Sequence, residues 1–170
     1  MTKKHIILGG AGLMTLVTAA TFVVFSAVII PKLGRLDDRE YIQTMQKINR
    51  DIQNPWFLGS FLGAALLVPV SVYLFKKSGS ATQVRLLAAA SLLYIIGTFG
   101  ITSAVNVPLN DKLDKVSVTT TSPSELATTR NDYESNWNKW HTARTVTAVA
   151  ALGAIIGAIV IAKPTKNKEK

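Results

Sequence analysis

Residues 5–30 read HIILGGAGLMTLVTAATFVVFSAVII and contain no Asp, Glu, Lys or Arg. A helix needs about 20 residues to cross the roughly 30 Å hydrocarbon core of a bilayer, so this stretch is long enough to span it. Three further windows without a formal charge follow at residues 52–75, 86–110 and 145–162. Because lipid offers no partner to an unpaired backbone group, each window is expected to be a helix. The sequence therefore predicts an all-α fold, an integral membrane four-helix bundle.

The first window resembles a secretory signal in one respect, because Lys3 and Lys4 precede it. The apolar core of a signal is about 7 to 15 residues long, and this window is far longer, so we expect it to remain as a span. The chain is predicted to form a single membrane domain over residues 1–170, with spans at about residues 6–30, 56–75, 85–106 and 142–162. Residues 31–55 and 107–141 are then loop regions on one side, and residues 163–170 form a flexible basic tail.

The net charge of +9 comes from 19 Lys and Arg against 10 Asp and Glu, and it is unevenly distributed. Nine basic residues fall in the N-terminus, residues 76–85 and the tail, whereas nine of the ten carboxylates lie in the two long loop regions. The positive-inside rule favours cytoplasmic termini, in a multi-pass protein of the cell membrane. Basic tails beside spans attract anionic headgroups, and no basic stripe with interleaved aromatic residues is present. The lipid bilayer is therefore the expected partner, and nucleic acid is not.

Both long loop regions are predicted to contain helix. In the first, Tyr41, Met45, Ile48 and Ile52 recur at helical spacing and form one apolar stripe. An amphipathic helix of this kind lies at the membrane surface or caps the bundle. In the second, the run Ser-Pro-Ser-Glu at residues 122–125 supplies the residues that begin a helix. We expect a helical extension from about Ser124 that runs without a break into span four.

Small residues spaced four apart mark two of the spans. Gly59 and Gly63 lie in the second, and Gly153 and Gly157 lie in the fourth. Such pairs let helix backbones approach closely in lipid. They fit packing inside the bundle and a homo-oligomer about equally well.

The composition excludes several kinds of site. The chain has no cysteine and only two histidines, and His5 and His141 are expected at opposite ends of the bundle. The sequence therefore predicts no metal site. The spans carry no charged residue at depth, whereas proton relays and coupled transporters depend on intramembrane charges. A four-span proton antiporter is therefore not expected.

Two asparagines mark the end of span three. Asn106 and Asn110 lie four residues apart around Pro108, whose missing amide proton leaves an upstream carbonyl free. A helix that kinks or ends here presents two carboxamides, which can donate hydrogen bonds to a ligand. The same two side chains can also simply stabilise a helix end.

One helical face before span four gathers aromatic and basic groups. Trp137, Trp140, His141 and Arg144 stand at offsets of zero, three, four and seven. An interfacial aromatic belt with a snorkelling arginine would explain the tryptophans. The same face could hold a flat aromatic anion by stacking and by charge-assisted hydrogen bonds.

Four spaced motifs occur between the spans in this order: Met45-Gln46-x-Ile48-Asn49-Arg50, Asn54-Pro55-Trp56-Phe57, Asn106-Val107-Pro108-Leu109-Asn110 and Trp137-x-x-Trp140-x-x-x-Arg144-Thr145. Over about residues 9–158 the chain resembles the anthrone oxygenase family of four-span membrane proteins. One position departs from the family pattern, which usually has Asn where this chain has His141.

The resemblance implies an oxidoreductase. Fungal members of the family convert anthrones to anthraquinones with molecular oxygen, without a metal or an organic cofactor. For this chain the resemblance implies cofactor-independent oxidation of a polycyclic aromatic or phenolic substrate. The implied catalytic residues are His141 as general base and Arg144 and Asn106 as donors to the developing oxyanion. The implied substrate-binding residues are Asn110 and Arg50 as further donors, Trp137 and Trp140 as stacking surfaces, and Gln46 and Asn49.

A non-enzymatic function stays open beside this one, because a fold does not fix a function. In that alternative the protein binds a lipid, a quinone or a protein partner through the same polar end. The expected small-molecule partner of the chain is an aromatic or lipid-like molecule.

Overall fold

The computed structural model describes residues 2–161, and all its regular structure in that range is helical. The predicted basic tail at residues 163–170 lies outside the described residues. The helices, in chain order, are α1 (Lys3–Val24), the π-helical segment η1 (Phe25–Ile29), α2 (Ile30–Leu33), α3 (Asp38–Asp51), α4 (Pro55–Phe75), α5 (Ala81–Leu92), the π-helical segments η2 (Leu93–Gly100) and η3 (Thr102–Asn106), α6 (Val107–Asp114) and α7 (Pro123–Val160).

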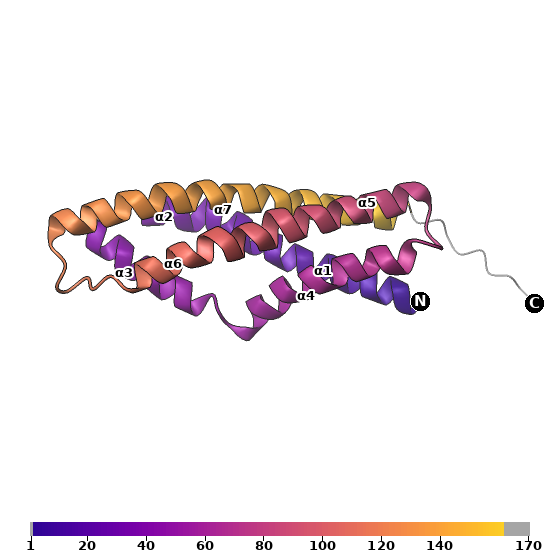
Figure 1. Cartoon of the computed structure of the whole chain (residues 1–170), viewed down its shortest axis with the longest axis horizontal. Helices are drawn as coiled ribbons and strands as arrows, with labels where there is room; N and C mark the ends of the chain where they lie inside the picture. The colour runs from indigo at the N-terminus through magenta and orange to yellow at the C-terminus, as the bar shows by residue number, and fades with distance from the viewer. Residues whose placement is uncertain (1, 162–170) are drawn as a thin grey trace, which may run out of the picture.

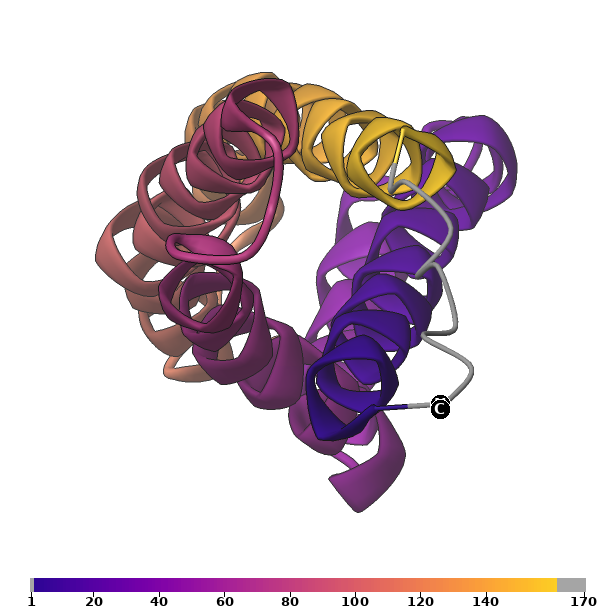
Figure 2. The ribbon, with the colours of Figure 1, turned by 90° about the vertical axis from the view of Figure 1, so that its right-hand side faces the viewer.

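Four helical rods are long and apolar enough to cross a membrane: Lys3–Leu33, Pro55–Phe75, Ala81–Asp114 and Pro123–Val160. Seen from the end that holds the N-terminus, they form a ring in which α1 packs against α4 and α7, and α5 also packs against α4 and α7 (Figure 2). The predicted all-α four-helix membrane bundle is confirmed. The cytoplasmic position of the termini stays a prediction.

Two glycines allow the closest approaches between the rods. A Cβ on Gly63 would lie 2.3 Å from Sδ of Met14, and a Cβ on Gly97 would lie 2.5 Å from Cγ2 of Thr147. A side chain at position 97 would collide with the short, β-branched Thr147, whereas one at position 63 would require the flexible Met14 side chain to move. Gly59 and Gly153 face open space instead. The predicted homo-oligomer is therefore neither required nor excluded by the glycine pairs.

Three of the four rods extend well beyond the membrane. They contain 31, 34 and 38 residues, whereas α4 contains only 21. At about 1.5 Å per residue, a 30 Å core accommodates α4 and leaves several turns of each other rod outside. These turns and α3 form what we call the head, around a second apolar cluster made of Leu33, Tyr41, Ile42, Met45, Leu113, Leu126, Tyr133 and Trp137. We call this end of the molecule the loop side.

Helix α3 is the amphipathic helix predicted in the first loop. It packs alongside α6 and α7 in the head, with its apolar stripe buried, since Tyr41, Ile42 and Met45 are at most 2% exposed. Burial raises the pKa of the Tyr41 phenol above its usual range. The predicted extension before span four is also present. Helix α7 begins at Pro123, and Oγ of Ser122 accepts a hydrogen bond from the backbone N–H of Glu125.

The expectation that span three ends near Pro108 is wrong, because the helix continues past this residue. The rod continues through α6 to Asp114, so residues 107–114 are helix and not loop. Pro108 lies in the first turn of α6, directly after the π-helical turns of η3. A wider turn before a proline lets the helix continue without its missing N–H donor.

Three sides of the bundle are continuous rods, whereas the fourth consists of two helices, α3 and α4, with a break between them. In Figure 1 these two helices follow one another along the same side of the molecule, with a sharp excursion of the chain between them. Asn54 fixes this turn, since its Nδ2 donates to the carbonyl of Asp51 at 3.0 Å and its Oδ1 accepts from the N–H of Phe57 at 3.0 Å. Pro55 at the first position of α4 prevents a continuous helix. We call residues 52–54 the α3–α4 break.

Candidate functional site

A cavity of about 240 Å³ lies at the level of the α3–α4 break. Its walls come from α1 and η1, the end of α3, the start of α4, η3 and α6, and α7. Five aromatic side chains line it: Phe22, Phe25, Phe57, Phe61 and Trp137. Such apolar walls with a few polar groups are typical of a small-molecule site.

Arg144 is the principal charged group on the buried wall of this cavity. Its side chain is only 7% exposed, and it forms no ion pair within residues 2–161. Its Nη1 donates to Oγ1 of Thr102 at 3.3 Å, and its Cζ lies 4.4 Å and 5.1 Å from the ring centroids of Phe22 and Trp137. A buried charge without a counter-charge costs several kcal/mol. An anion bound beside Arg144 would lower that cost.

His141 holds Arg144 in place. Its Nδ1 accepts hydrogen bonds from Nε and Nη2 of Arg144, at 3.2 and 3.0 Å. A guanidinium only donates, so Nδ1 carries no proton, and the neutral ring carries its hydrogen on Nε2. Nε2 lies 3.2 Å from the carbonyl of Phe22 and 3.0 Å from Oγ of Ser26. The ring also stacks on Trp137, with centroids 4.8 Å apart. Both nitrogens are thus engaged, which disfavours His141 as a general base in this arrangement.

Asn110 orients the tryptophan of the cavity. Its Oδ1 accepts from Nε1 of Trp137 at 2.7 Å and from the hydroxyl of Tyr133 at 2.9 Å. The same hydroxyl accepts a hydrogen bond from Nδ2 of Asn49 at 3.3 Å. Asn49, Asn110 and Trp137 all line the cavity. Because the oxygen of Asn110 is occupied by two donors, its NH₂ group is the part that remains for a ligand.

Asn106 lies behind the cavity wall. It is fully buried, and its Nδ2 donates to the carbonyl of Trp137 at 3.3 Å. Its Oδ1 accepts no hydrogen bond from the described residues. The side chain therefore ties η3 to α7 and does not itself line the cavity.

The family model described as anthrone oxygenase matches residues 55–154. The chain belongs to the anthrone oxygenase family. The matched region runs from the start of α4 into α7 and contains the positions of Asn110, Trp137, His141 and Arg144 of the cavity. Phe22 and Asn49 lie before it. No curated protein and no solved structure matches the chain.

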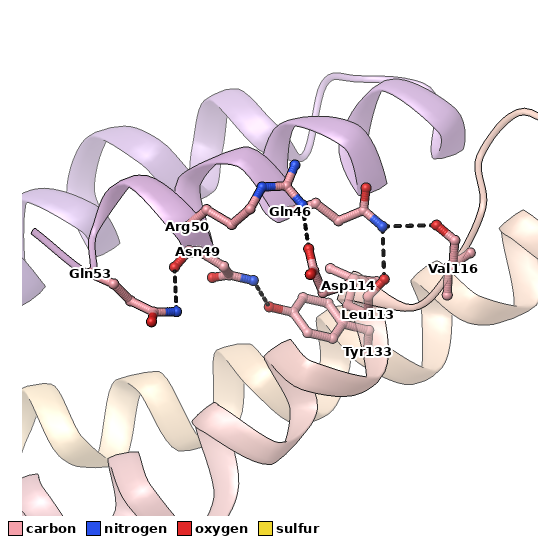
Figure 3. Close-up of polar contacts among 8 residues, drawn as sticks. All are labelled: Gln46, Asn49, Arg50, Gln53, Leu113, Asp114, Val116 and Tyr133. Atoms are coloured by element: carbon pink, nitrogen blue, oxygen red, sulfur yellow. Dashed lines mark hydrogen bonds and ion pairs between the residues drawn. The ribbon is translucent and has the colours of Figure 1, made fainter.

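Two residues predicted to bind substrate in this anthrone oxygenase family member, Gln46 and Arg50, do not line the cavity. Figure 3 shows both reaching from α3 toward the end of α6. Nε2 of Gln46 donates to the carbonyls of Leu113 and Val116, at 2.8 and 2.9 Å. Arg50 is exposed and pairs with Asp114. Both side chains fasten α3 to the end of α6, so the structure gives them a role in holding the head together.

Trp140 also stands apart from its neighbours on the predicted stripe. It is half-buried and does not line the cavity, and Nζ of Lys139 lies 5.8 Å from its ring. At 100° per residue, Trp140 is about 60° around the helix from Trp137, on the edge of the buried face. Trp137, His141 and Arg144 share the centre of that face.

Sequence reasoning missed the partners that the cavity takes from the other spans. Phe22, Ser26 and Thr102 lie within apolar windows, where nothing local separates a site residue from a packing residue. Asp111 was missed too, although it directly follows Asn110 and lines the cavity. Its position one residue after the asparagine motif was the available signal.

Within residues 2–161, no three His, Asp or Glu side chains come close enough to hold a metal ion. His5 lies at the opposite end of the bundle from His141, as predicted, with its ring 5.6 Å from that of Phe75.

Proposed function

We propose that this member of the anthrone oxygenase family oxidises a polycyclic phenolic substrate with molecular oxygen, without a cofactor, in the cavity beside Arg144. The observation that carries the proposal is the buried guanidinium without a counter-charge on the wall of an aromatic-lined cavity. That arrangement suits a flat aromatic molecule that becomes an anion as it reacts.

The size of the cavity favours a small ligand. Drug-sized sites measure roughly 300 to 1,000 Å³, so about 240 Å³ has room for one small flat molecule and not for a two-chain lipid. Phe22 and Trp137 approach Arg144 closely, so an aromatic ring and its anionic oxygen can be bound at neighbouring points.

Arg144 has hydrogen-bonding capacity left for the substrate. A guanidinium has five N–H donors, and its three bonds to His141 and Thr102 leave two. In the proposed reaction a ring methylene loses a proton, and the charge moves onto the ring oxygen. The two remaining donors of Arg144, with the NH₂ group of Asn110, would stabilise that oxyanion in a site that needs no reorganisation.

The anion then reduces oxygen. It gives up electrons to O₂ as a carbon–oxygen bond forms, and the resulting peroxide anion takes back one proton from water to become a hydroperoxide at the former methylene. Loss of water from the hydroperoxide leaves a ketone, so that one CH₂ group and one O₂ become one C=O group and one H₂O. Because both nitrogens of His141 are engaged, we assign the first proton to water at the open side of the cavity, and His141 acts by positioning Arg144.

The test is conversion of an anthrone by the full-length protein in lipid vesicles, under oxygen and under argon. We expect one O₂ consumed per quinone formed, no product under argon, and a loss of about 10²- to 10³-fold in rate for Arg144→Gln. Arg50→Gln is the matched control, because it removes an exposed arginine outside the cavity. Equal rates for wild type and Arg144→Gln would refute the proposal. Binding of the anthrone without oxygen uptake would support the non-enzymatic alternative.

A further inference from the structure

We propose that the ligand enters the cavity sideways from the bilayer, through a mouth between α4 and the η3–α6 segment at the α3–α4 break. The inference rests on the cavity being a ligand site, as proposed above, but not on the oxidation itself.

The position of the mouth follows from which lining residues are exposed. Five of them are: Gln53, Leu58, Ser103, Val107 and Asp111. The first two belong to the α3–α4 break and α4, and the other three belong to η3 and α6. No lining residue of α1 or α7 is exposed. The open side of the cavity therefore lies between α4 and η3–α6, and the buried arginine lies on the opposite, closed side.

The mouth has an apolar and a polar part. Leu58 and Val107 are 38% and 43% exposed. Ser103, Val107 and Asp111 recur every four residues and so form one rim along the rod. Asp111 is one turn, about 6 Å, closer to the loop side than Val107. Gln53 precedes α4 and lies at that same side. The rim thus carries its carboxylate and amide, Asp111 and Gln53, toward the loop side, and Leu58, Val107 and the small hydroxyl of Ser103 toward the membrane centre.

The apolar part lies at the depth of the hydrocarbon boundary. Leu58 stands 17 residues before Phe75, the last residue of α4, which places it about 26 Å along the helix from that end. In a core of about 30 Å it lies just inside the loop-side boundary. Trp56, two residues earlier, is 88% exposed, as expected for an interfacial tryptophan.

Lipid contact at Leu58 and Val107 favours a route from the bilayer over one from water. An apolar aromatic molecule concentrates in the membrane because burial of its surface is worth about 25 cal/mol per Å². A molecule with a phenolic oxygen would sit at the hydrocarbon boundary, which is the level of the mouth. It can then reach Arg144 without passing through water.

The experiment uses Trp137 as the reporter, because it lines the cavity and is only 3% exposed. The chain has three tryptophans, so Trp56→Phe with Trp140→Phe leaves Trp137 as the single emitter. The full-length reporter protein is placed in phosphatidylcholine vesicles. A brominated naphthol, a lipid-soluble aromatic quencher, is added in a stopped-flow instrument, and the rate of Trp137 quenching is measured.

Two pairs of substitutions to Phe are made in the reporter protein. One pair narrows the apolar part of the mouth, and the other narrows the polar part. Leu58→Phe with Val107→Phe should slow quenching by at least tenfold, whereas Gln53→Phe with Asp111→Phe should change it by less than twofold. Leu58→Ala with Val107→Ala should leave the rate unchanged or raise it, because smaller side chains do not narrow the mouth.

The opposite ranking of the two pairs, or an equal effect of both, would overturn the membrane route while leaving the ligand site intact. A complete absence of Trp137 quenching in the reporter protein would instead overturn the site itself and the route with it.

Discussion

Arg144 donates two hydrogen bonds to one nitrogen of His141, from Nε at 3.2 Å and from Nη2 at 3.0 Å to Nδ1. The two side chains lie three residues apart on α7, so helical geometry alone brings them together. The contact fixes the guanidinium against the wall of the cavity and fixes the protonation state of the imidazole. It makes His141 a positioning residue for Arg144 and not an acceptor of the substrate proton.

This assignment predicts that His141→Asn retains function. The Asn oxygen can accept from Arg144 as Nδ1 does, and the resemblance to the family implies Asn at this position. We expect the oxidation rate to stay within about threefold of wild type, with the same pH profile between about pH 5 and 8, where an unperturbed histidine would titrate. Steady-state kinetics across that range measure both. A profile that loses its pH dependence in His141→Asn would identify the histidine as the base after all.

Because the charge of Arg144 is unpaired, we predict that its removal abolishes ligand binding without lowering the free energy of unfolding. Arg144→Met removes an uncompensated buried charge, so the free energy of unfolding should stay within about 1 kcal/mol of wild type or rise. Binding of an anthrone should nevertheless be lost. Chemical denaturation in detergent and a binding titration measure the two quantities.

Arg130 is the matched control for Arg144. It is also largely buried, but it pairs with Asp38 and Glu134, at 3.1 and 2.8 Å. Arg130→Met should lower the free energy of unfolding by about 1 to 3 kcal/mol, because it leaves those carboxylates unpaired. A larger loss of stability for Arg144→Met than for Arg130→Met would contradict the distinction between a binding arginine and a structural one.

Asn110 is predicted to contribute strongly to stability. Asn110→Ala leaves Nε1 of Trp137 and the hydroxyl of Tyr133 without their acceptor. Each unsatisfied buried donor costs about 1 to 3 kcal/mol, so we expect a total loss of about 2 to 6 kcal/mol. In a Tyr133→Phe background the cost of Asn110→Ala should fall by about 1 kcal/mol. Equilibrium unfolding of the four proteins in this cycle provides the values.

The control for Asn110 is Asn136, an exposed residue of α7 that donates to the carbonyl of Asp132. Asn136→Ala should change the free energy of unfolding by less than about 0.5 kcal/mol. Additive costs for Asn110→Ala and Tyr133→Phe would show that the hydrogen bond between the two side chains contributes nothing.

Gln46 is predicted to hold the head together without contacting the ligand. Its Nε2 donates to two carbonyls near the end of α6 (Figure 3). Gln46→Glu replaces that donor by a carboxylate facing two carbonyl oxygens, so it should destabilise the protein more than Gln46→Ala does. Protection of the α3 amides from hydrogen exchange should fall in the same order, with Gln43→Ala, an exposed neighbour, as the control. Unchanged α3 protection in Gln46→Glu would contradict this role.

The four spans could be predicted because charge-free windows long enough to cross a bilayer have few other structures available to them. The apolar stripe of Tyr41 and Met45 likewise predicted helix α3. What the pattern did not contain was where α3 would dock. The docking site of α3 depends on how far the other rods extend beyond the membrane. The sequence did not predict that α6 continues the third rod past Pro108 to Asp114.

The candidate site was predictable in the part that comes from one helix. Trp137, His141 and Arg144 share a face of α7, and helical spacing is enough to group them. Their partners come from distant spans. The carbonyl of Phe22 lies 119 residues from His141, and the hydroxyl of Thr102 lies 42 residues from Arg144. Trp140 was predicted to bind substrate and does not line the cavity. Helical spacing groups residues on one face, but it does not show which residue at the edge of that face points away from a cavity.

The most direct test of the account is the absorption spectrum of a bound anthrone under argon, where no turnover can occur. If Arg144 stabilises the substrate oxyanion, the wild-type protein in vesicles should convert the neutral keto form to the anion at a pH where the free compound is neutral. The apparent pKa of the bound compound should fall by about two units, the equivalent of roughly 2.7 kcal/mol. Arg144→Met should bind no anion, and His141→Asn should behave as wild type. A bound anthrone that keeps the neutral spectrum in the wild-type protein would contradict the central claim.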